Sequence, residues 1–299
     1  MLNTLLRLFI LLLSLDFSAP ALAQEQTEQI TVEEFLAALK FQPGTIQLPG
    51  GIASLNLPDT FRYLAPEDAE RLLTQGWGNP GGYNTLGMIL PANVNPLGMD
   101  GWGVIITYEE DGHVNDDDAD TIDYGALLKD MQEATEQANE ERKNQGYDAL
   151  TLVGWAETPT YDRASHKLYW AKELASDRAE QHTLNYNIRL LGRKGVLVLN
   201  AVAGMEQIDT IKAEMQNVVA FSNFTPGNGY TDFNADTDKA ATYGIAALVA
   251  GGAAAKMGLF AKLFALLIAF KKLIILGAIG LGALLKNLFG RKKKAAEHL

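Results

Sequence analysis

The sequence contains no cysteine among its 299 residues, which excludes disulfide bonds, thiolate metal sites, a cysteine nucleophile and a lipid-modified cysteine anchor. Histidine is scarce, with four residues, and no HxxxH or HExxH pattern occurs, which argues against a zinc hydrolase. A GxSxG motif is also missing. The remaining composition, 47% hydrophobic and 20% charged, excludes a mainly disordered, collagen-like or coiled-coil chain.

The first residues have the three parts of a secretory signal. Arg7 supplies a positive charge, Leu8–Leu15 is a short apolar core, and Ala21–Ala23 is a small-residue cleavage site. The core is shorter than the roughly 20 apolar residues that a membrane-spanning helix needs. We therefore predict that residues 1–23 are a signal peptide, with an uncleaved anchor as the alternative.

Charge is divided unevenly along the mature chain. Residues 24–239 hold 15 lysines and arginines against 34 aspartates and glutamates, whereas residues 240–299 hold nine basic residues and one acid, Glu297. The two parts carry net charges of −19 and +8. Because an acidic body repels phosphates, we expect no nucleic acid among the partners.

The basic tail is strongly apolar, which predicts a membrane anchor over residues 240–299. A single span would leave residues 291–294 (RKKK) in the cytoplasm, as the positive-inside rule favours. A two-helix hairpin, and a span followed by a shallow interfacial helix, are the alternatives. Small residues at four-residue spacing, such as Ala278 and Gly282, would let helices approach closely and form oligomers.

Residues 24–239 have the pattern of a single α+β domain, an antiparallel sheet with helices packed on a face. A polar loop, 222–239, is expected to join this domain to the tail. The order of hairpins followed by a closing helix resembles the PsbP-like and Mog-one-like sandwich, a likeness of fold that implies no function. Periodicity and turn residues predict helices at 31–39, 66–75, 123–145 and 208–221, and strands at 44–48, 52–57, 86–90, 102–108, 150–158, 167–174, 184–191 and 196–203.

Five segments carry a more specific resemblance: 86–91 (LGMILP), 101–108 (GWGVIITY), 111–119 (DGHVNDDDA), 185–195 (NYNIRLLGRKG) and 238–244 (DKAATYG). With these segments the chain resembles a bacterial family of unknown function, whose members are often described as uncharacterised membrane-anchored proteins. The resemblance covers most of the mature chain, the tail included. It implies an exported, membrane-tethered protein and implies no reaction.

Residues 109–120 (EEDGHVNDDDAD) form the densest cluster of carboxylates. Calcium takes six to eight oxygen ligands, so the alternating Asp116, Asp118 and Asp120 are candidate calcium ligands, and no other cofactor is expected. The spacing is not that of an EF-hand, because neither the glycine at the sixth position of such a loop nor the glutamate at its twelfth position is present. The alternative is a solvated turn that caps a helix near Asp123.

Three other patterns have a structural interpretation. Residues 76–81 (GWGNPG) match GxGxxG, but they follow a predicted helix and contain proline, so we predict a turn and not a nucleotide site. Trp102 and Trp155 lie in strand-like runs and are expected in the core, although stacked aromatics can also line a sugar or peptide groove. Arg189 and Arg193 could bind an anion, but pairing with acids of the body is favoured.

These patterns predict a protein of the bacterial inner membrane whose globular domain is periplasmic. The favoured role is a protein-interaction or accessory module, with another envelope protein or a second copy as partner. One alternative is an enzyme, or a ligand- or cation-binding protein, with a pocket near 109–120. Another is a membrane-active oligomer built by the tail. No motif identifies a reaction, so the residues lean away from an enzyme, while a Ser/His/Asp site assembled from distant residues stays open.

Overall fold

The computed structural model describes residues 31–82, 84–177 and 179–251, and it divides the chain into two units, Met1–Ala38 and Leu39–Leu299. The predicted signal peptide and residues 252–299 of the predicted anchor, called the tail from here on, lie outside the described residues, whereas residues 240–251, also predicted in the anchor, are described and include three core residues of the body. In the first unit, the described part contains helix α1 (Val32–Ala37), shorter than predicted. A capping box begins this helix: the Glu34 N–H donates to the Thr31 hydroxyl, and the Thr31 N–H donates to the Glu34 carboxylate.

The second unit is built on an eight-stranded sheet in the order β1-β4-β5-β6-β10-β9-β8-β7, beside a small sheet in the order β11-β3-β2. Every described strand pair is antiparallel, which confirms the predicted α+β class. The strands are β1 (Phe41–Gln42), β2 (Thr45–Gln47), β3 (Ala53–Asn56), β4 (Phe61–Leu64), β5 (Gly87–Pro91), β6 (Gly103–Glu109), β7 (Leu150–Asp162), β8 (Lys167–Ser176), β9 (Thr183–Leu191), β10 (Val196–Gly204) and β11 (Ser222–Phe224).

The helices of the second unit are short apart from two. Helix α4 has the predicted bounds, and α3 differs from its prediction by one residue at each end. Within the described parts of the chain, no helix is both long and apolar enough to cross a membrane. The helices are α2 (Pro66–Arg71) with a following π turn (Leu72–Gly76), α3 (Tyr124–Asn144), α4 (Ile208–Phe221) and α5 (Ile245–Ala250), with 3-10 turns at Pro49–Gly51, Ala119–Thr121, Met205–Gln207 and Tyr230–Asp232.

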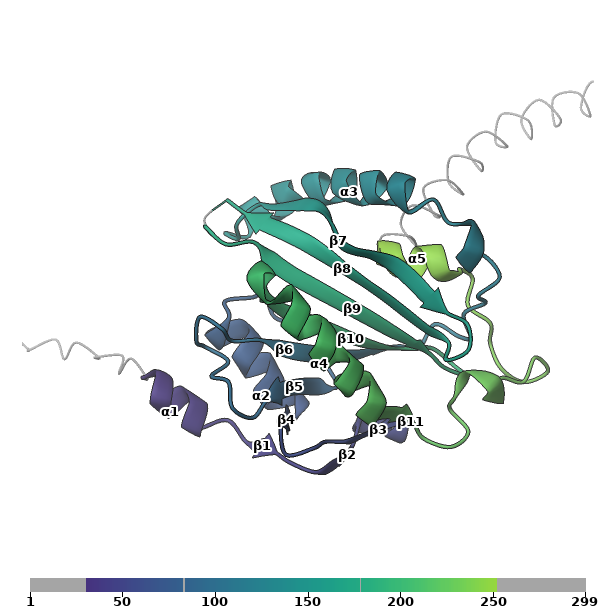
Figure 1. The fold of residues 1–299 in the computed structure, drawn as a ribbon, viewed down its shortest axis with the longest axis horizontal. Coiled ribbons are helices and arrows are strands. Elements are labelled where there is room, and N and C mark those ends of the chain that lie inside the picture. The colour runs from purple at the N-terminus through teal and green to yellow at the C-terminus, as the bar shows by residue number, and fades with distance from the viewer. Residues whose placement is uncertain (1–30, 83, 178, 252–299) are drawn as a thin grey trace, which may run out of the picture. The chain divides into compact units, whose positions relative to one another are not determined.

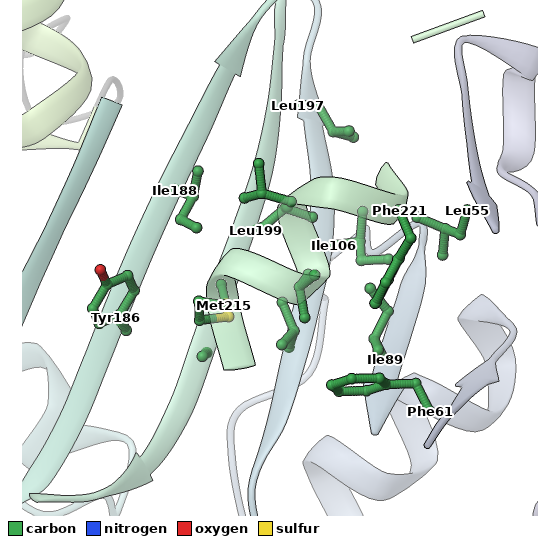
Figure 2. Close-up of a cluster of buried hydrophobic side chains, with 14 of the residues drawn as sticks. Leu55, Phe61, Ile89, Ile106, Tyr186, Ile188, Leu197, Leu199, Met215 and Phe221 are labelled. Carbon is green, nitrogen blue, oxygen red and sulfur yellow. The ribbon is translucent and has the colours of Figure 1, made fainter. Parts of the chain in front are cut away.

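Side-chain alternation along the central strands divides the interior into two cores. On β10, Leu197 and Leu199 belong to the first core, while Val196 and Val198 belong to the second. Helix α4 covers the first core with a stripe that includes Met215, and Figure 2 shows these side chains converging between the helix and the sheet. The central strands carry apolar side chains on both faces. Other elements must therefore pack on each face of the sheet to keep these side chains from water.

Helices therefore pack on both faces of the sheet, where we predicted one (Figure 1). The second face is covered by α3 and α5 over β7, β8 and β10. Helix α3 contributes one buried residue, Met131, which agrees with its thin apolar stripe. The predicted core position of Trp102 is confirmed, since it is 3% exposed, and Trp155 is half-buried, with its indole N–H donating to the Tyr124 carbonyl at 3.1 Å.

The hairpin of β7 and β8 is the clearest departure from the predicted strands. We predicted a turn over residues 159–165, but β7 continues through Pro159 to Asp162, and the turn is shorter. Proline lacks an N–H and is tolerated at sheet edges, and β7 is the edge strand. Pro159 therefore does not end the strand, as we had predicted it would.

Truncation of Leu199 tests the first core, because this side chain is fully buried on a central strand. Leu199→Ala is expected to lower the free energy of unfolding by about 3 kcal/mol through lost burial and a residual cavity. The measurement is denaturant unfolding of the full-length chain in detergent, followed by tryptophan fluorescence. Met99→Ala is the control, since Met99 is 91% exposed, and equal effects of both substitutions would contradict the core assignment.

Candidate functional site

Three segments that are distant in the sequence meet at one end of the main sheet: loop 111–118, turn 161–166 and segment 229–246. We call this region the junction. The first segment carries much of the acidic run, and the last leads towards the apolar tail. Segment 222–239, predicted as a polar loop, instead begins with β11 and is held to the body by the contacts described next.

The backbone joins the acidic loop to the segment that precedes α5. The His113 N–H donates to the Lys239 carbonyl at 2.9 Å, and the Ala241 N–H donates to the His113 carbonyl at 2.7 Å, as a parallel bridge. Gly112 permits this approach, because its φ is +113° and a Cβ there would lie 2.6 Å from the Lys239 carbonyl oxygen. The segment thus adds to the body as a short strand does.

An ion pair fixes the middle of the same segment. Arg193 donates from Nε and Nη2 to the two carboxylate oxygens of Asp238, at 2.7 and 3.1 Å. The Asn234 N–H donates to the same carboxylate at 2.8 Å. The Asp238 side chain is 4% exposed, and the hydrogen bonds from Arg193 and then Asn234 lower its pKa to about 2. The predicted pairing of Arg193 with an acid of the body is confirmed.

Asp118 holds the first turn of α5. Its carboxylate accepts hydrogen bonds from the backbone N–H groups of Ile245 and Ala246, at 2.9 and 3.2 Å. These N–H groups have no partner inside the helix, and a carboxylate also interacts favourably with the helix dipole. Gly244 makes room for this contact, since a Cβ there would lie 2.6 Å from the Asp118 carboxylate. A residue 127 positions away therefore caps the helix that precedes the tail.

Histidine and aromatic rings stack inside the junction. The His113 ring lies 4.2 Å from the Tyr230 ring and 4.0 Å from the Phe233 ring, while the His166 ring lies 4.0 Å from that of Tyr230. Burial lowers the pKa of His113, against the opposing effect of a hydrogen bond from its ring to the Gly192 backbone carbonyl. His166 has φ +52°, a left-handed conformation that costs a non-glycine residue about 1 kcal/mol or more.

The acidic loop also reaches the β7–β8 turn through side chains. The Tyr161 hydroxyl donates to Asp116 at 2.7 Å and lies 3.3 Å from Nδ1 of His166. Arg163 lies 3.5 Å from Asp116 and donates to Asp120 at 2.8 Å. Burial, and then the bond to Asp116, raise the pKa of the Tyr161 phenol, which keeps its proton as a donor.

The three predicted calcium ligands thus each contact a different partner. Asp116 accepts from Tyr161, Asp118 caps α5, and Asp120 pairs with Arg163. In the described ranges, no group of three or more His, Asp or Glu side chains is arranged to hold a metal ion. The calcium site stays a prediction, and the observed use of these carboxylates is to tie other segments to the loop.

A shallow depression of about 390 Å³ lies beside the acidic run, between α3 and α5. Its lining includes Thr121, Asp123, Asp130 and Ala246. The predicted helix cap is confirmed here, because the Asp123 carboxylate accepts the first free N–H groups of α3 at 3.0 and 2.9 Å. The residues that line it include neither a histidine nor a basic residue. The depression therefore does not place a histidine base beside a nucleophilic side chain.

The other candidates have plain structural roles. Residues 76–81 begin with the last residue of the π turn after α2 and continue as irregular chain, in agreement with the predicted turn. The Ser165 hydroxyl donates to Asp162 at 2.6 Å and not to its neighbour His166. Sequence reasoning missed Tyr161 and Tyr230, because no motif marks a tyrosine whose partner lies 45 or 116 positions away.

Arg189 departs from its prediction. None of the ion pairs of the described residues includes it, although Glu109 at the end of β6 is close enough to oppose the lowering of its pKa by burial.

The Arg193–Asp238 ion pair should make the stability of the fold depend on pH. The folded pKa of Asp238 is about 2 against an ordinary 3.8, so the pair stabilises the fold above about pH 4 and is lost as pH falls through 2. Asp238→Asn is expected to lower the thermal midpoint at pH 7 by several degrees, and the gap to wild type should close at about pH 2. Asp236→Asn, an exposed neighbour, serves as control; a gap that is constant with pH would refute the ion pair.

A search of the curated proteins finds no match. Similar solved structures include CyanoP, the cyanobacterial PsbP of Synechocystis sp. PCC 6803 (TM-score 0.34, 12% identity, covering 60% of this chain and 91% of that one). The Ran-binding protein Mog1p of Saccharomyces cerevisiae gives a TM-score of 0.35 at 9% identity, covering 62% and 96%. LpqN, involved in cell envelope biogenesis of Mycobacterium tuberculosis, gives 0.29 at 16%, covering 66% and 98%.

At these scores and identities, the PsbP-like and Mog-one-like sandwich stays a prediction, and no function follows from the likenesses. The family comparison is stronger. The family described as "Protein of unknown function (DUF2167)" matches residues 40–282, which is most of the chain. The resemblance seen in the sequence to a family of unknown function is confirmed, and the chain belongs to this family.

Proposed function

We propose that the chain is a membrane-tethered envelope protein whose globular domain, predicted over residues 24–239, acts outside the cytoplasm as an accessory or protein-interaction module. The signal-like residues 1–23 support export, and the apolar, basic residues 252–299 support an anchor in the inner membrane. Another envelope protein or a second copy of the chain is the expected partner. The acidic body makes nucleic acid an unfavourable partner.

The observation that carries this proposal is the junction. A protein that needed only an anchor would join body and tail by a loose linker, whose ends move freely. Here the segment before the tail is bonded along its backbone at His113, clamped by Arg193, and capped at α5 by Asp118. The body therefore holds the start of the helix that leads to the tail. Such a connection suits a module that presents one particular face to a partner in the same membrane.

The junction can be loosened without touching the rest of the surface. Asp118→Ala removes the cap of α5, and Asp117→Asn is its matched control, an exposed acid next to it. We expect full-length wild type and Asp117→Asn to cross-link to the same one or two proteins in native membranes. Asp118→Ala should lower that yield severalfold, because the orientation of the body is no longer fixed. Mass spectrometry of the cross-linked products provides the measurement.

A second version of the chain, with residues 252–299 replaced by a foreign anchor, separates body from tail. Partners retained by this version would assign the interaction to the body. Partners lost with it would move the function into the tail. No partner in any version, or equal yields from Asp118→Ala and Asp117→Asn, would contradict an oriented interaction module.

A further inference from the structure

Polar side chains interrupt the second core where it crosses the middle of the sheet. Strand alternation places them on one face, and the register sets Trp170, Asn187 and Asn200 side by side on β8, β9 and β10. Lys172 stands opposite Asn185 in the next row of the same face. We call this set the polar strip; it consists of Trp170, Lys172, Asn185, Asn187, Arg189 and Asn200.

Arg189 is the unusual member of the strip, because it is a buried charge without an ion pair. The residue is 8% exposed, and in the described parts of the chain no carboxylate lies within ion-pair distance of it. Its Nε is buried without a hydrogen-bond partner, and its Nη1 makes only long contacts of 3.4 Å, to Asn187 and the Ile188 carbonyl. Buried charges are normally paired, since an unpaired one costs several kcal/mol.

The guanidinium points along the strip towards a second cation. Its central carbon lies 4.9 Å from the centroid of the Trp170 ring, so the side chain leans from its own row into the next. Lys172 lies one row further, about 14 Å away between Cα atoms, a span that two long side chains cover from both ends. Burial, and then the charge of Arg189, lower the pKa of Lys172 to about 8. The two cations thus repel across the Trp170–Asn187 row.

Two more polar atoms in that row lack partners. The indole Nε1 of Trp170, a donor, and the Oδ1 of Asn200, an acceptor, are both buried without a hydrogen bond. Buried polar groups are satisfied in native proteins as a rule, and those that are not require an explanation. A bound group that carries negative charge and hydrogen-bonding atoms would satisfy all of them together.

Access to the strip is from the Lys172 end. Lys172, Asn185 and Asn200 are half-buried, whereas Arg189 at the other end is covered. The one neighbouring carboxylate that acts on Arg189, Glu109, belongs to the covered end, beyond Arg189 as seen from Lys172. A ligand that enters between the two cations therefore meets positive charge first.

We propose that the polar strip binds a small oxyanion, a phosphate or carboxylate group, between Arg189 and Lys172. Arginine matches the geometry of both groups, and lysine adds a second charge. Trp170 and Asn200 would contact the rest of the ligand. The inference is independent of the proposed function, because it rests on a face of the sheet and not on the junction.

Calorimetric titration of the full-length chain in detergent tests this site, with inorganic phosphate and acetate as probes. Wild type should show saturable binding of at least one of them at one site per chain. Lys172→Gln, at the accessible end, should weaken binding about tenfold or more. Lys167→Gln is the matched control, since Lys167 is also half-buried on β8 but belongs to the opposite face, and it should bind as wild type does.

Arg189→Met separates a binding role from a structural one. Removal of a buried charge that has no ion pair, and only a cation–π contact with Trp170 and long hydrogen bonds, should abolish binding while leaving the thermal midpoint in anion-free buffer unchanged or higher. If no binding occurs in wild type, buried water fills the strip and the proposal fails. If phosphate affects wild type, Lys172→Gln and Lys167→Gln equally, the effect is a general one of salt, and the proposal also fails.

The source of the oxyanion is distinguished in lipid nanodiscs. In discs of phosphatidylcholine alone, wild type should bind added phosphate. If the natural source is an anionic lipid headgroup, discs that contain phosphatidylglycerol should prevent this binding in wild type. If the source is a free small molecule, both kinds of disc should give the same phosphate affinity, which also supports the site.

Discussion

Side-chain alternation across β8, β9 and β10 is the constraint on which the rest of the structure depends. Successive residues of these strands face two different cores, so each strand must be compatible with burial on both sides. A register shift of one residue would exchange the faces, carrying Arg189 into the first core and Ile188 out of it. The same alternation that packs α4 against Leu199 therefore also sets the cations and amides of β8–β10 on the opposite face.

The sequence predicted the elements whose signals are local. Helix α4 has a complete apolar stripe, and the β9–β10 hairpin has a glycine turn, so both were found within a residue of their bounds. The four-residue β4 was missed because, unlike the equally short β3, it is not next to a glycine turn that marks a hairpin, and β7 was shortened because Pro159 resembles a strand terminator. That proline is acceptable only on an edge strand, and strand order is a property of the whole sheet.

The candidate site shows the same limit more strongly. Asp116, Asp118 and Asp120 were singled out as calcium candidates, since charge density is visible in the sequence. Their uses were not, because the partners come from turn 161–166 and segment 229–246, at separations of about 45 and 127 residues. A carboxylate that caps a helix and one that binds calcium use the same oxygens. The pattern alone does not distinguish the two, and the amide donors that Asp118 contacts are visible only in the folded structure.

The junction and the polar strip meet at the segment that begins α5. Tyr243 donates to Asp111 in the junction and lies near Arg189, whose pKa it helps to raise against the effect of burial, and Ile245 of α5 packs in the second core. Asp118, which caps α5, therefore also holds the segment that lies near the closed end of the strip. Water admitted there would solvate Arg189 and weaken its attraction for an anion. For the proposed oxyanion site, the acidic loop therefore has an indirect role, since it repels anions itself but holds the segment near the buried end of the strip.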